Sequence, residues 1–259
     1  MKFELRFVIS WLMTLAIFLS YANSSIAGDG ILLQSTRIIY SSSKANGITF
    51  TVTNKTSNDY LLQSRVSPWP ENEYFSGETD NFNSNVSERK LDGSERTVPF
   101  IVLPPLTRFD SGEAINLNIR LTEKTLPNDR ETLFTLKIKT IPGQSLKEDD
   151  KQPSLALALQ NNLKLFYRPQ EIITLDAEIR SDKLIFQYME NHLLVENPTP
   201  YYITFSDISV NNNSISLNNR MLSPYSTAQY PMNDTPEVIS WSILDDRGSS
   251  TEVKYRKLK

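Results

Sequence analysis

Segments that alternate apolar and polar residues, or that are rich in β-branched and aromatic residues, run through most of the chain. A period of two residues is typical of β-strands that bury one face, whereas helices repeat about every 3.6 residues. Turn-forming Asn, Pro and Gly residues separate the segments at the spacing of an immunoglobulin-like sandwich. The sequence therefore predicts an all-β fold. The clearest strand candidates are Gly47 to Asn54, Ala114 to Leu121, Leu133 to Ile141 and Lys183 to Met189.

The N-terminus is expected to be an export signal and not part of the fold. Basic Lys2 and Arg6 precede an apolar run at residues 7–18, and residues 25–27 have a small-x-small pattern. Together these features are typical of a cleaved signal peptide. A membrane anchor is disfavoured because the apolar run is shorter than the roughly 20 residues that cross a bilayer. We expect residues 1–27 to be removed, which leaves an exported protein without a stable membrane anchor.

The composition excludes several classes of function. The chain has no cysteine and a single histidine, His192, which has no nucleophile motif near it and is expected to lie on a strand. A zinc site and a glycine-rich phosphate loop are also missing from the sequence. The formal net charge of −3 provides no basic stripe for nucleic acid. The composition thus removes most options for catalysis and metal binding.

The series of strand-like segments is interrupted around Pro169, whose nitrogen cannot donate a hydrogen bond to a β-ladder. A second series of strand-like segments follows this proline. We place a domain boundary near Arg168 to Ile172, which predicts one domain over residues 28–168 and a second over residues 169–259.

Two polar tracts, Trp69 to Thr97 and Gly143 to Ser154, lack a clear period. Both are expected to be surface loops. The residues leave open whether they are solvated connections or contribute contacts to a partner.

An alternating strand precedes the domain boundary. Leu155, Leu157 and Leu159 are separated by alanines, and Lys164 follows five residues after the last of them. The leucines either fill the core of their own domain or form an exposed apolar stripe on an edge strand that can add to a partner's sheet. A half-buried ammonium at Lys164 is costly unless an anion pairs with it.

Five motifs stand out along the chain: STRIIY (Ser35 to Tyr40), VLPPLTRFDSGE (Val102 to Glu113), LPNDRETLF (Leu126 to Phe134), KLFYRP (Lys164 to Pro169) and NPTPYY (Asn197 to Tyr202). In order and spacing they resemble the periplasmic pilus chaperones, the PapD-like family. The resemblance implies two immunoglobulin-like β-sandwich domains in a boomerang arrangement, located in the periplasm. It also implies a non-enzymatic function, with no catalytic residues, no metal and no cofactor. In this function the chaperone caps a pilus or fimbrial subunit by lending it a strand and delivers it to an outer-membrane usher.

The same resemblance implies roles for individual residues. Leu155, Leu157 and Leu159 would be the residues of the donor strand. Arg37 and Lys164 would anchor the C-terminal carboxylate of the subunit, because two cations give charge-assisted hydrogen bonds to one anion.

An interdomain ion network is implied as well. Its members would be Arg108 and Glu131 from the first domain and Asp246 from the second, with Asp245 as the competing choice for the last position. A planar guanidinium between two carboxylates can hold two domains at a set angle.

The chain departs from the family pattern after Glu131, where Thr135 and Lys137 replace the usual Trp and Asn, and we expect this to alter packing in the cleft. The family is divided by the length of the loop before the donor strand, and the lack of cysteine favours the short-loop class.

Two rival functions are an exported fibre subunit or adhesin and an exported hydrolase. A subunit typically has an alternating N-terminal extension and no second domain, whereas here the alternating strand is internal. Self-association of the free protein through the leucine stripe is a further expectation.

Overall fold

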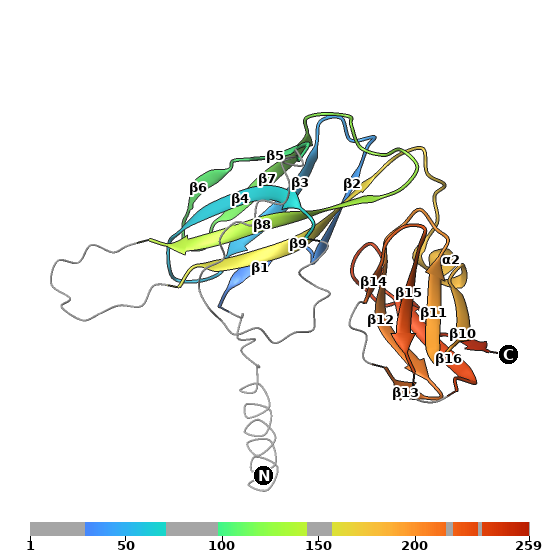
Figure 1. Ribbon diagram of the computed structural model, residues 1–259. Helices are drawn as coiled ribbons and strands as arrows, with labels where there is room; N and C mark the ends of the chain where they lie inside the picture. The colour runs from blue at the N-terminus through green and yellow to red at the C-terminus, as the bar shows by residue number, and fades with distance from the viewer. Residues whose placement is uncertain (1–28, 71–97, 144–156, 216–219, 233–234, 259) are drawn as a thin grey trace, which may run out of the picture. The chain divides into compact units, whose positions relative to one another are not determined.

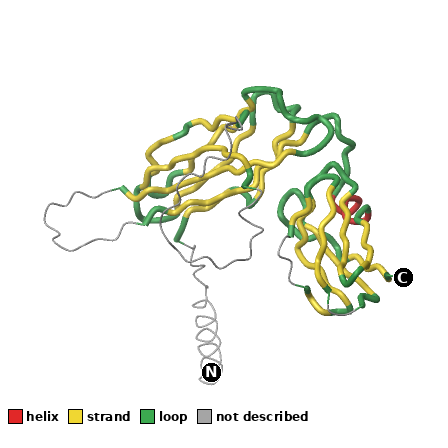
Figure 2. The backbone as a smooth tube through the Cα atoms, viewed as in Figure 1, coloured by secondary structure: helices red, strands yellow, loops and turns green. Residues whose placement is uncertain are grey.

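The structure is a computed structural model that describes residues 29–70, 98–143, 157–215, 220–232 and 235–258. The predicted signal peptide, most of the two polar tracts and Leu155 lie outside these residues. The described chain is almost entirely strands and loops, with one short helix, α2 (Ala177–Asp182) (Figures 1 and 2). The prediction of an all-β fold is confirmed.

Two sheets form the first β-sandwich (Figure 1). One sheet is antiparallel with the order β1-β3-β7-β5, and the other has the order β2-β9-β8-β4-β6, in which β2 and β9 run parallel. The strands are β1 (Ile31–Leu33), β2 (Arg37–Ser41), β3 (Ile48–Asn54), β4 (Tyr60–Pro68), β5 (Phe100–Leu103), β6 (Leu106–Phe109), β7 (Ala114–Leu121), β8 (Thr132–Pro142) and β9 (Leu159–Arg168).

The alternation in the sequence explains how this sandwich is held together. In β7, Ile115, Leu117 and Ile119 are buried, whereas the residues between them face outward. They join Phe50 and Val52 of β3 in one core cluster, which also receives residues of the other sheet. Each fully buried aliphatic side chain contributes about 1.5–3 kcal/mol to folding.

The second β-sandwich has its own core, built around residues such as Leu193, Phe205 and Trp241. Its three-stranded sheet has the order β10-β11-β15, and its five-stranded sheet has the order β13-β12-β16-β17 with β14 paired to β12. The strands are β10 (Ile185–Met189), β11 (His192–Asn197), β12 (Ile203–Val210), β13 (Asn213–Ser214), β14 (Met221–Leu222), β15 (Ser226–Pro231), β16 (Val238–Ile243) and β17 (Lys254–Lys257).

Local chemistry sets the ends of several elements in this domain. Asp176 caps α2, because its carboxylate accepts the backbone N–H of Ile179. Lys183 is the C-cap of this helix, so β10 begins at Ile185 and not at the predicted Lys183. The hairpin from β12 to β13 turns through Asn211 and Asn212, which have φ of 50° and 67°, a conformation that asparagine adopts more readily than most residues.

Candidate functional site

Arg37 and Lys164 lie directly opposite one another on parallel neighbouring strands, β2 and β9. Residues opposite each other in a sheet place their side chains on the same face. Arg37 is buried and Lys164 is half-buried. The two cations expected to act together are therefore brought together by the fold.

The Arg37 guanidinium already has partners in the second domain. Its Nη1 donates to the backbone oxygens of Leu244, at 3.2 Å, and Asp245, at 2.6 Å, and its Nη2 donates to Oγ1 of Thr204 at 3.2 Å. Burial lowers the pKa of Arg37 from its usual value, and the charges of Asp246 and Glu131 oppose this. A guanidinium has five N–H donors, so Nε–H and one Nη2–H remain for a further acceptor.

Lys164 is the unpaired cation of the site. Its Nζ lies 5.4 Å from the centre of the Trp69 ring, and no described residue forms a hydrogen bond or ion pair with it. Burial, followed by the charge of Arg37, lowers the pKa of Lys164 to about 8. An anion at this point would restore the charged ammonium, because an opposite charge favours ionisation.

An apolar cluster surrounds this pair of cations. Leu133, Phe166 and Met221 are its buried members, and Ile39 and Trp69 pack against it with other residues. The Arg37 guanidinium stacks over Phe166, 5.1 Å from the ring centre. Charge interactions are stronger in such surroundings than in water.

The start of β9 leaves one of its edges free among the described residues. β8 pairs with β9 from Leu159 to Tyr167, but β2 pairs only with its second half, from Lys164 to Arg168. No described strand lies on the β2 side of residues 159–163. Their outward N–H and C=O groups are therefore available to a partner strand.

Apolar side chains accompany this free edge. Leu159 is 61% exposed and Leu157, two residues before β9 begins, is 66% exposed, whereas Leu163 and Leu165, on the same face of β9 as Leu159, are buried in the core. These two leucines thus do not fill the core of their own domain. Leu159 continues the apolar face of β9 beyond its buried part. Leu155, the third predicted donor residue, lies outside the described residues.

Arg168 connects two carboxylates that are far apart in the sequence. Its Nε donates to Oε1 of Glu131 at 2.8 Å, and its Nη1 and Nη2 donate to the two oxygens of Asp246 at 2.6 and 2.8 Å. Arg180 adds a hydrogen bond to Asp246 at 3.1 Å, and the backbone N–H of Tyr202 donates to Glu131 at 2.9 Å. Glu131 and Asp246 thus belong to one ion network.

The two carboxylates differ in their electrostatics. Burial raises the pKa of Glu131, which is only 3% exposed, and Arg168 opposes this increase. Burial also disfavours ionisation of Asp246, but hydrogen bonds and charges from Arg168 and Arg180 outweigh it and lower its pKa to about 2.

The prediction that Arg108 belongs to this network is wrong. Arg108 is an exposed residue of β6, and it pairs with Asp110 and, at 3.1 Å, with Asp59 of the same domain. Arg108 lies opposite Leu61 of β4, which lies opposite Ile141 near the end of β8, whereas Glu131 directly precedes the start of β8, so the two residues lie at opposite ends of this strand. The arginine missing from the prediction is Arg168, which the KLFYRP motif contains.

The choice between Asp245 and Asp246 is also decided by geometry. The Asp245 carboxylate accepts the backbone N–H groups of Arg247 and Ser249 and so closes a turn. Asp246 faces Arg168, and Asp245 contributes to the site only through the backbone oxygen that Arg37 contacts.

Other candidate sites offer less chemistry. His192 lies at the start of β11, where its Nδ1 is 2.8 Å from the backbone oxygen of Glu190. Within the described ranges, no group of three or more His, Cys, Asp or Glu residues could hold a metal. No described helix is long and apolar enough to span a membrane.

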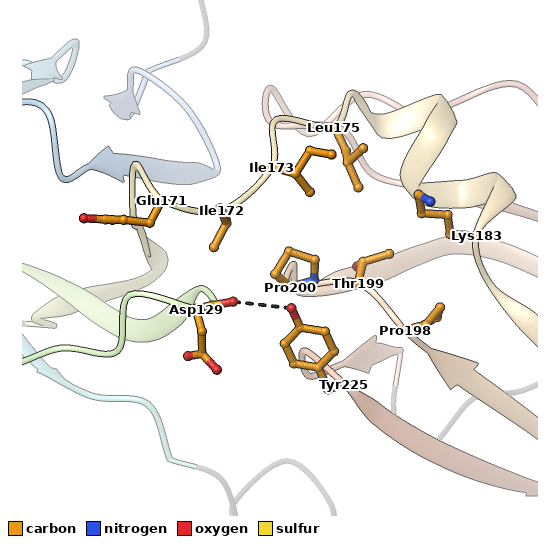
Figure 3. A pocket seen from close by; sticks show the side chains of 10 residues that line it. All are labelled: Asp129, Glu171, Ile172, Ile173, Leu175, Lys183, Pro198, Thr199, Pro200 and Tyr225. Carbon is orange, nitrogen blue, oxygen red and sulfur yellow. Dashed lines mark hydrogen bonds between the residues drawn. The ribbon is translucent and has the colours of Figure 1, made fainter.

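A hollow of about 360 Å³ lies beside the linker between the two series of strands (Figure 3). Ile172 and Ile173 form part of its wall, and the hydroxyl of Tyr225 donates to the backbone oxygen of Asp129 at 3.4 Å. None of the predicted site residues lines it.

Comparison with known proteins decides the family. Residues 78–173 match the family model "Pili and flagellar-assembly chaperone, PapD N-terminal domain", and residues 180–255 match "Pili assembly chaperone PapD, C-terminal domain". The chain is 30% identical over 247 residues to the probable fimbrial chaperone SfmC of Escherichia coli K12, covering 95% of this chain and 96% of SfmC. The chain belongs to the PapD-like family of pilus-assembly chaperones.

Other members of the PapD-like family agree with this assignment. The chaperone protein FimC of Escherichia coli K12 is 30% identical over 91% of this chain and 87% of its own length. The structure of the Salmonella enterica SafA pilin in complex with the SafB chaperone matches with a TM-score of 0.70 and 25% identity, covering 88% of this chain and 96% of that one. The architecture of this PapD-like chaperone is accordingly two β-sandwich domains.

Proposed function

We propose that this chaperone binds a fimbrial subunit in the periplasm, completes the subunit's sandwich with the first half of β9, and delivers it to an outer-membrane usher. The observation that carries the proposal is the free edge of residues 159–163, which begins with exposed Leu159, follows exposed Leu157 and leads directly to an unpaired ammonium at Lys164. The SafB chaperone, a related protein, is known in complex with a pilin.

The free edge supplies the two parts of strand addition. Its backbone groups give affinity that does not depend on side chains, and apolar residues at every second position enter pockets of the partner. In the free protein the same edge is the surface through which we expect self-association, since unpaired edges readily pair with other strands.

Lys164 and Arg37 would set the register between β9 and the strand of the subunit. A terminal carboxylate placed at Lys164 would also reach the two N–H donors that Arg37 retains. Because the anion can bind at only one point along β9, it fixes which subunit residues lie opposite Leu157 and Leu159. The network of Glu131, Arg168 and Asp246 would hold the second domain beside this anchor.

Hydrogen–deuterium exchange tests strand addition directly. The backbone N–H groups of residues 159–163 that point away from β8 are expected to exchange rapidly in the free chaperone and to become protected when a fimbrial subunit is bound. Amides of β7, inside the other sheet, serve as the internal control. Unchanged exchange at residues 159–163 in a stable complex would show that the subunit binds elsewhere.

Subunit binding is expected to weaken above about pH 8. Below this pH the Lys164 ammonium is already charged, so the affinity should be constant. At higher pH the free protein loses this proton and binding of a carboxylate must take it up again, so the affinity falls by up to about tenfold per pH unit. Dissociation constants measured between about pH 7 and pH 9.5 check this. Lys164→Arg, which stays charged, should remove the fall, and identical profiles for the two proteins would contradict it.

A further inference from the structure

A row of polar side chains crosses the sheet of the first domain at the level of Lys164. Ser67 of β4 lies opposite Thr135 of β8, Thr135 lies opposite Lys164 of β9, and Lys164 lies opposite Arg37 of β2. Opposite residues share a face and have Cβ atoms about 4.5–5.5 Å apart in antiparallel pairs. The polar row, Ser67-Thr135-Lys164-Arg37, is thus continuous across four strands.

The two hydroxyls of the polar row are buried and unsatisfied. Thr135 is 2% exposed, and neither its Oγ1 nor the Oγ of Ser67 has a hydrogen-bond partner among the described residues. Folded proteins pair nearly all buried polar groups, because leaving one unpaired costs free energy. The Thr135 hydroxyl lies directly opposite the unpaired ammonium of Lys164, which indicates a ligand that supplies its missing partner.

The surroundings of the row select the class of ligand. Leu133 and Phe166 lie two residues along from Thr135 and Lys164 on the same face, and the Trp69 ring lies over the ammonium. Shielding from water strengthens hydrogen bonds to a charged group. A small anion with two oxygens suits a cation and a neighbouring hydroxyl donor.

We propose that Thr135 binds the terminal carboxylate of the subunit together with Lys164, an inference that rests on the proposed function. Lys164 pairs with one oxygen of the terminal carboxylate, and the Thr135 hydroxyl donates to the other. The hydroxyl thus recognises the end of a chain, whereas the edge of β9 recognises its apolar pattern.

The test uses a synthetic peptide of alternating apolar and polar residues that ends either in a free carboxylate or in a carboxamide. Calorimetric dissociation constants for the two peptides give a carboxylate preference for each variant of the full chain. The unaltered chaperone should bind the carboxylate peptide more tightly. Thr135→Val, which keeps the shape of the side chain, should reduce this preference about tenfold, as expected for a hydrogen bond to a charged group. Thr135→Ser should retain it.

Ser67→Ala is the matched control, because it removes the other unsatisfied hydroxyl of the row, two strands from Lys164 on the side away from the free edge. This variant should leave both dissociation constants and the carboxylate preference unchanged. Equal loss of the preference in Ser67→Ala and Thr135→Val would contradict a direct contact between Thr135 and the carboxylate.

The outcomes separate this inference from the proposed function. If the unaltered protein prefers the carboxylate but Thr135→Val shows the same preference, the hydroxyl does not bind the anion and the inference is overturned alone. If the unaltered protein has no preference, the carboxylate anchor itself fails. Thr135→Val should unfold at the same denaturant concentration as the unaltered protein or a higher one, since it removes an unsatisfied group. A lower midpoint would show that the hydroxyl has an internal partner.

Discussion

The double substitution Leu157→Glu and Leu159→Glu is expected to abolish recovery of a complex with the subunit. Burial of two leucines in a partner contributes about 3–6 kcal/mol, and burial of unpaired carboxylates is unfavourable in its own right. Each 1.4 kcal/mol of lost binding free energy lowers the affinity about tenfold, so the affinity for the subunit should fall more than about 100-fold. Co-purification of the subunit from cells that express both proteins measures it.

The fold of this variant should be unaffected, because both leucines are mostly exposed in the free protein. Val253→Glu, which changes a 51% exposed valine of the second domain, is the matched control and should leave binding intact. Equal loss of the subunit in both variants would indicate a general effect of added charge. Full recovery with the leucine variant would remove these residues from the donor strand.

Arg168→Met is expected to lower the free energy of unfolding by about 3–5 kcal/mol, the usual cost of removing one partner of a buried ion pair. The substitution removes the guanidinium that pairs with the buried Glu131 carboxylate. It also removes two hydrogen bonds from Asp246. Urea unfolding followed by circular dichroism measures the change.

Two comparisons sharpen this prediction. Arg108→Met removes an arginine with two ion pairs that are exposed, so it should change stability far less. Adding Glu131→Gln to Arg168→Met should recover part of the lost stability, because the buried charge is gone. A small effect of Arg168→Met, comparable to that of Arg108→Met, would show that the network does not stabilise the fold.

The sequence predicts the strands well where one face is buried. The segment from Ala114 to Leu121 coincides with β7, because strict alternation leaves one register for burial. Helix α2 was not predicted, since its six residues are too few to show a helical period. Its signal was the capping residue Asp176.

The site was predictable only in part. Arg37 and Lys164 were identified within motifs, but the same motifs gave no distances between strands. Arg168 lies 78 positions before Asp246, so only the fold shows that the two pair. The row formed by Ser67 and Thr135 likewise depends on the registers of β4, β8 and β9, which no local pattern specifies.

The measurement that tests the central claim most directly is recovery of a one-to-one periplasmic complex between the chaperone and a co-expressed candidate subunit, compared for the unaltered protein, Lys164→Ala and Arg37→Ala. Circular dichroism of each purified variant establishes that it is folded. The account predicts that both variants fold and lose the subunit, because each removes one of the two cations that bind its terminal carboxylate. Full recovery of the complex with both variants would contradict the anchor and the register that it sets along β9.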